Sequence, residues 1–151
     1  KKVNLVDPVG FSNKVGTPTF HEHNDDRVHV EGVVLEMENV SFSSFVDVIG
    51  GKITDQGLEL PTTNGLLTRS DGDSCPDGNF GEWNIFLYSV EGQNIGRERL
   101  TLADLRAHIL APQASVPPGD CIIMEFGEYK SRTDKLCNFY KTSIQQGKFN
   151  Y

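Results

Sequence analysis

Three histidines and several carboxylates lie close together near the N-terminus. The segment FHEHNDDRVHVEG covers residues 20–32 and contains His21, His23 and His29. Alternate residues of a β-strand point to the same face, so His21 and His23 share a face, and an unbroken strand would add His29 to it. Imidazole nitrogens are good ligands for zinc and copper. The spacing therefore indicates a transition-metal site. The alternative is a solvated edge strand whose polar side chains discourage pairing with other strands.

A second group of oxygen donors lies in the segment DGDSCPDGNFGE, residues 71–82. The donors are Asp71, Asp73, Asp77, Asn79 and Glu82. Counted from the first of them, their order is close to the ligand spacing of a calcium-binding loop. Two positions depart from that pattern, because Cys75 replaces an oxygen donor and Pro76 replaces the glycine of the sharp turn. The segment predicts a calcium site, and the alternative is a pair of Asp-Gly surface turns.

The sequence carries none of the common catalytic motifs. It has no GxSxG elbow, no HExxH, no GxxxxGK[ST] and no GxGxxG at the start of a helix. Cys121 and Cys137 lie in apolar patterns, where a thiol is usually inert. His108 lies in a predicted helix, where a surface histidine is more common than a catalytic base. We therefore expect a protein that is not an enzyme.

Composition excludes several kinds of partner. The formal net charge is -7, and no stretch combines clustered Lys and Arg with aromatic residues, so we expect no nucleic-acid binding. No run approaches the roughly 18 apolar residues that a membrane helix needs. The three cysteines lack CxxC spacing, and Asn39-Val40-Ser41 is a glycosylation sequon. These features favour an extracellular or cell-surface location after removal of a signal peptide.

The first 20 residues differ in pattern from the rest of the chain. Apolar residues alternate there with polar ones and are interrupted by prolines and glycines, which is typical of an extended arm. A chain of 151 residues is long enough for one core. We therefore predict an extended N-terminal arm over residues 1–20 and a single globular, β-rich domain over residues 21–151.

Periodicity predicts the main elements of that domain. Apolar residues recur with helical spacing in residues 41–50, 100–110 and 133–141. Strand patterns cover residues 27–37, 83–92 and 120–127, and the first of these suggests two strands joined by a tight turn. The strand at 83–92 is apolar on both faces and is therefore expected to be central in its sheet. Two or three short helices with several strands predict an α+β fold.

The order of several segments resembles that of a poorly characterised group of small exported archaeal and bacterial domains. The segments are FHEH, VSFSSFVDVIG, ITDQGLEL, NIFLYSVEGQ and PGDCIIMEFGE. The similarity covers about residues 19–128, and FHEH and the PGD strand are its more specific parts. Members of the group carry a Phe-His-Glu-His motif, a short helix rich in phenylalanine, a strand ending in an Asn-Gly turn and a closing strand. The resemblance implies export, an α+β fold with a grasp-like mixed sheet and crossing helices, and no established activity.

The resemblance also implies a cysteine pairing. Members of the group often carry a cysteine where this chain has Gln56-Gly57, and an arginine where it has Cys121. With the usual partner of Cys75 missing, the comparison implies a disulfide between Cys75 and Cys137.

The pattern of the N-terminal arm predicts self-assembly, which is the main function that we expect. Strand addition to a neighbouring copy would join main chains and let apolar side chains of the arm fill pockets. Those side chains are Val3, Leu5, Val9 and Phe11. A head-to-tail contact of this kind does not close, so it builds a filament or surface layer of identical copies. Calcium in the oxygen-rich loop would reduce the repulsion between acidic subunits. The alternative is a monomeric exported module that binds copper or zinc through the three histidines.

Overall fold

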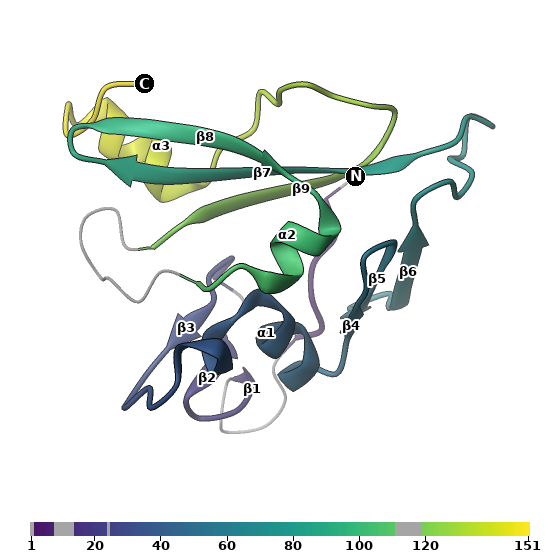
Figure 1. Ribbon diagram of the computed structural model, residues 1–151, viewed down its shortest axis with the longest axis horizontal. Helices are drawn as coiled ribbons and strands as arrows, with labels where there is room; N and C mark the ends of the chain where they lie inside the picture. Colours follow the sequence, from purple (N-terminus) through teal and green to yellow (C-terminus); the bar gives the residue numbers. More distant parts are fainter. Residues whose placement is uncertain (1, 8–13, 24, 111–118) are drawn as a thin grey trace. The chain divides into compact units, whose positions relative to one another are not determined.

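The chain folds into two compact units, which are described separately. The computed structural model describes residues 2–7, 14–23, 25–110 and 119–151 (Figure 1). The first unit combines Lys1–Ser70 with Leu102–Ile109, and the second combines Asp71–Thr101 with Leu110–Tyr151.

The first unit contains two small antiparallel sheets and its helices. One sheet has the order β1-β2-β3 and the other the order β4-β5-β6. Its elements are β1 (Val15–Gly16), β2 (Phe20–Glu22), β3 (His29–Val30), the 3-10 helix η2 (Met37–Val40), α1 (Phe42–Val48), β4 (Lys52–Ile53), β5 (Gly57–Thr62), β6 (Gly65–Ser70) and α2 (Leu102–Ala107). The sheet formed by β1, β2 and β3 carries the histidine-rich segment.

Helix α1 anchors this sheet. Its N-cap is Ser41, whose Oγ accepts a hydrogen bond from the backbone N–H of Ser44 at 3.2 Å. Phe42, Phe45 and Val46 are buried. The ring of Phe45 lies 5.5 Å from the ring of Phe20 on β2, measured between centroids. Burial of these two rings fixes which face of β2 turns toward the core.

The N-terminal arm pairs with the far end of β5. Leu5 forms an antiparallel bridge with Thr62, and the N–H of Val6 donates to the carbonyl of Pro61 at 3.1 Å. Val3 is half exposed. The other two predicted arm contacts, Val9 and Phe11, lie outside the described residues.

The described residues of the second unit form a three-stranded antiparallel sheet and one helix. Its elements are β7 (Glu82–Glu91), β8 (Asn94–Leu100), β9 (Cys121–Gly127) and α3 (Asn138–Gln145). Strand β7 lies between β8 and β9, which confirms the central strand that its two apolar faces predict. Helix α3 is held to this sheet by Tyr140, which is fully buried and whose hydroxyl lies 3.1 Å from the carbonyl oxygens of Tyr88 and Gly119.

One disulfide is present, but the implied pairing was wrong. Cys121 at the start of β9 is bonded to Cys137, with 5.8 Å between the two Cα atoms, and Cys75 is free. Packing of α3 against the sheet brings Cys137 next to β9, since Leu136, Tyr140 and Cys121 belong to one buried cluster. Cys75 instead lies in a loop that closes on itself, where its N–H donates to the carbonyl of Asn79 at 2.7 Å.

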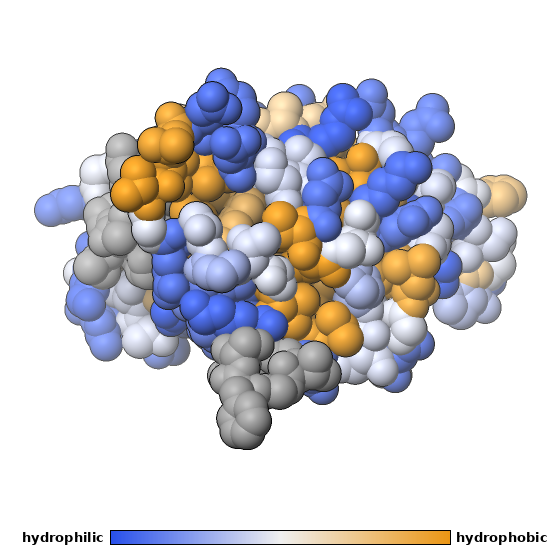
Figure 2. Space-filling view, turned by 90° about the horizontal axis from the view of Figure 1, so that it is seen from below, coloured by the Kyte–Doolittle hydropathy of each residue, from blue (hydrophilic) through white to orange (hydrophobic). Residues whose placement is uncertain are grey.

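The α+β class is confirmed, with a difference in the sheets and in one hairpin. The strands form three small antiparallel sheets in place of the single mixed sheet that the resemblance implied. Residues 27–37 were expected to form their own hairpin, but β3 pairs back onto β2, where Phe20 lies opposite Val30. Val33 and Leu35 are consequently 81% and 88% exposed. Figure 2 shows that hydrophobic patches on the face seen from below are separated by hydrophilic side chains.

The disulfide is expected to stabilise the fold. Replacing both Cys121 and Cys137 by alanine should lower the free energy of unfolding by roughly 3 kcal/mol, the scale for closing a loop of about this length. Urea denaturation of the oxidised protein measures this difference. Cys75→Ser is the control and should change stability little, because Cys75 has no disulfide partner. Peptide mapping that linked Cys75 to another cysteine would contradict this assignment.

Candidate metal centre

The pleat of the β1-β2-β3 sheet directs neighbouring side chains of β2 to opposite faces. Phe20 on β2 points to the core, so His21 points to the opposite face. The strand register places Gly16 opposite His21 on one side and His29 opposite His21 on the other. Directly opposed residues share a face, so His29 lies beside His21 through cross-strand pairing and not through one continuous strand.

The side chain of His21 is fully buried and oriented by one backbone group. Its Nδ1 lies 3.0 Å from the carbonyl oxygen of Thr17. A carbonyl can only accept, so Nδ1 carries the proton and donates it. In this neutral tautomer, Nε2 carries a lone pair that is available to bind a cation. A histidine that binds a metal through one ring nitrogen usually donates the N–H of its other ring nitrogen to a group such as a backbone carbonyl.

A tight turn positions that carbonyl. The N–H of Thr17 donates to the carbonyl of Phe20 at 2.8 Å, and the N–H of Phe20 donates to Oγ1 of Thr17 at 3.0 Å. Gly16 enters the turn with a φ of 114°, and a Cβ there would lie 2.5 Å from the carbonyl oxygen of Phe20. Only glycine fits both the conformation and the space.

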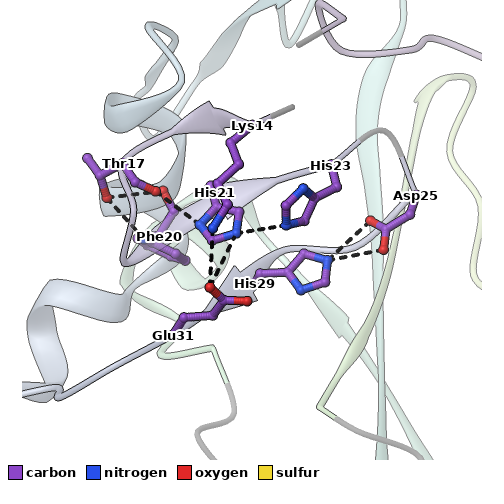
Figure 3. A network of polar contacts seen from close by, with 8 residues as sticks. All are labelled: Lys14, Thr17, Phe20, His21, His23, Asp25, His29 and Glu31. Atoms are coloured by element: carbon purple, nitrogen blue, oxygen red, sulfur yellow. Dashed lines mark hydrogen bonds and ion pairs between the residues drawn. The ribbon is translucent and has the colours of Figure 1, made fainter. Parts of the chain in front are cut away.

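Three donor atoms converge on the face of the sheet that carries His21 (Figure 3). Nε2 of His21 lies 3.0 Å from Nε2 of His23, and 3.9 Å from Oε2 of Glu31. One ligand atom from each of these residues lies within 4.8 Å of the others. Two nitrogens bound to one zinc ion at about 2.0–2.1 Å are separated by roughly 3.3 Å when the geometry is tetrahedral. Small movements of His23 and Glu31, together with loss of the proton that Nε2 of His23 donates to His21, would complete a three-donor site.

His29 lies at the edge of this cluster. Its ring is stacked on His21 at 5.6 Å and lies edge-on to His23 at 4.8 Å, between centroids. Its Nε2 lies 3.1 Å from a carboxylate oxygen of Asp25. When Nε2 donates to that carboxylate, Nδ1 is the nitrogen left to bind a metal.

Lys14 and burial both influence the charge states of the cluster. Its Nζ lies 3.3 Å from Oε2 of Glu31, and Figure 3 shows its side chain beside His21 and Glu31. The hydrogen bond from Lys14 lowers the pKa of Glu31. Burial lowers the pKa of His21, and the positive charge of Lys14 lowers it further. Both effects favour a neutral imidazole and an ionised carboxylate at neutral pH, which are the protonation states that bind metals.

The structure brings together the predicted His21, His23 and His29, and adds two residues that the sequence reasoning missed. Glu31 was assigned to a turn, and Lys14 was not considered. Alternation alone could have found Glu31, because it follows His29 by two residues and so shares its face. Lys14 depends on the pairing of β1 with β2, which no local pattern reveals.

The oxygen-rich loop has a different arrangement. Oδ1 of Asp71 accepts the N–H of Trp83 at 2.7 Å, and Oδ1 of Asp77 accepts the N–H of Asn79 at 3.1 Å. Glu82 forms an ion pair with Arg99 at 2.7 Å. Within the described part of the chain, the carboxylates of residues 71–82 do not converge as the donors of His21, His23 and Glu31 do. Calcium at Asp71, Asp73, Asp77, Asn79 and Glu82 stays a prediction.

Comparisons with protein-family models, with curated proteins and with solved structures gave no match for this chain. Among the helices of the described residues, none has both the length and the apolar character needed to cross a membrane.

Gly16→Ala tests the turn that orients His21. An alanine held at positive φ typically costs roughly 1–2 kcal/mol. We expect Gly16→Ala to lower the free energy of unfolding by more than this, because its Cβ would also contact the carbonyl of Phe20. Gly32→Ala is the matched control: its φ of 88° is also positive, but no atom lies within 4 Å of the added Cβ. Chemical denaturation compares the two variants. Equal losses would show that the contact at Gly16 is unimportant.

Proposed function

We propose that this protein binds a divalent transition metal, zinc or copper, through His21, His23 and Glu31. The observation that carries this proposal is the orientation of His21. Its Nδ1 donates to the carbonyl of Thr17, so its lone pair at Nε2 faces Nε2 of His23 at 3.0 Å. Two imidazoles and one carboxylate suit zinc and copper, whereas calcium and magnesium prefer sites made only of oxygen.

The position of the donors supports reversible binding from solution. His21 is buried, but Glu31 is more than half exposed, so the third donor faces solvent. Three protein donors leave at least one coordination position for water. We assign this chain a binding role and no catalytic one.

An extracytoplasmic location fits this role. The disulfide between Cys121 and Cys137 would persist in an oxidising compartment and is uncommon in the cytosol. We propose that the protein meets its metal outside the cytoplasm.

Metal titration of histidine variants tests the site. Calorimetry with Zn²⁺ and, separately, Cu²⁺ should give one ion per chain. We expect His23→Ala and Glu31→Gln each to weaken binding by about 10–100-fold or more, because each removes one ligand. His21→Ala should abolish binding. Since His21 is buried, its fold must be checked by circular dichroism.

His108→Ala is the matched control, because it removes an imidazole outside the cluster. Affinity in this variant should equal that of the wild type. The proposal fails if the wild type takes up no stoichiometric metal, or if His108→Ala weakens binding as much as His23→Ala does.

A second candidate function is self-assembly through the arm, and the pairing of the arm favours it. Leu5 bridges to Thr62, Val6 donates to Pro61, and the N–H of Thr63 donates to the carbonyl of Asn4 at 3.4 Å. The arm thus already adds as a short strand at the end of β5. We propose that the same pairing, made with a neighbouring copy, builds a filament or surface layer of this protein.

Deleting residues 1–7 separates the two functions. The truncated chain should stay monomeric in light scattering and form no filaments in electron micrographs, while it keeps its metal affinity because Lys14 and the donors remain. Assembly of the truncated chain to the same extent as the full chain would contradict a role for the arm, as would a full chain that stays monomeric at high concentration.

A further inference from the structure

Lys14 and a bound metal would compete for the same atom. Oε2 of Glu31 is the oxygen that lies 3.3 Å from Nζ of Lys14, and it is also the oxygen that lies 3.9 Å from Nε2 of His21. A metal ligated by His21 and Glu31 must therefore take the oxygen that the ammonium group of Lys14 now contacts.

The fold holds Lys14 at this position. Lys14 directly precedes β1, whose Val15 pairs with Glu22 and whose Gly16 pairs with His21. The ion pair of Lys14 with Glu31 places its ammonium group at the cluster. The side chain of Lys14 is about one third exposed, so its ammonium group can move into solvent when Glu31 binds something else.

We propose that Lys14 is a built-in competitor of the metal, which lowers the affinity of the site and makes it an exchange site that takes up and releases its ion. This inference rests on the proposed metal binding at His21, His23 and Glu31. The ammonium group acts twice: it occupies a ligand oxygen, and it repels a dication at short range.

The alternative to an exchange site is a permanent structural one. A structural zinc site is closed by four protein ligands. Here one of three donors is shared with a lysine and exposed to solvent. This arrangement suits a protein that buffers or passes on a metal.

Lys14→Gln tests the inference. We expect it to tighten Zn²⁺ or Cu²⁺ binding about tenfold and to slow the loss of metal to a chelator, because neither competition for Glu31 nor repulsion remains. Lys14→Arg keeps the charge and should restore the wild-type affinity. Added salt should weaken the Lys14–Glu31 pair and so narrow the gap between wild type and Lys14→Gln.

Lys2→Gln is the matched control. It removes the same charge from a lysine that pairs with Asp26 at 2.7 Å, a carboxylate that is not one of the three donors. Unchanged affinity in Lys2→Gln with tighter binding in Lys14→Gln supports the inference. Equally tighter binding in both variants would show that the effect comes from net charge alone and would overturn the inference. Unchanged affinity in Lys14→Gln would also overturn the inference. A wild type that binds no metal would instead contradict the proposed function itself.

Discussion

The packing of Phe20 against Phe45 determines the arrangement of the polar cluster. Burial of that aromatic pair fixes the face of β2 that meets α1, with 5.5 Å between ring centroids. The two-residue period of a strand then directs His21 and His23 away from the core. Strands β1 and β3 pair on either side of β2, and the cluster is completed by His29 of β3, by Lys14 just before β1 and by Glu31 just after β3. The cluster therefore follows from one hydrophobic contact and the geometry of a three-stranded sheet.

Strong local periodicity explains which parts of the fold could be predicted. Apolar residues with helical spacing identified α1, and an apolar run on both faces identified β7 as central. Strand β8 (Asn94–Leu100) was missed because it is mostly polar and exposed, so it carries little periodic signal. The bond between Cys121 and Cys137 depends on how α3 packs on the sheet, and a comparison of cysteine positions along the chain could not reveal it.

The candidate site was only partly predictable for the same reason. Alternation correctly placed His21 and His23 on one face, because their relation is local. His29 reached that face through cross-strand pairing, although the sequence argument relied on an unbroken strand. Glu31 was missed because residues 27–37 were expected to form a hairpin, with Glu31 in its turn. Lys14 required knowledge of the β1-β2 register, which the aromatic contact of β2 and the turn at Gly16 help to set.

Each polar group of the cluster already has a partner within the protein. His21 donates to Thr17 and accepts from His23, while Glu31 pairs with Lys14. Burial of the His21 ring is thus compensated by hydrogen bonds, which is the condition for a buried polar side chain to be tolerated. The fold does not need a cation to satisfy these groups, unlike a zinc finger, whose ligands have no other partners. A metal that binds here must replace existing contacts, so its affinity reflects the difference between two well-satisfied states, and that difference can be small enough for the ion to be released.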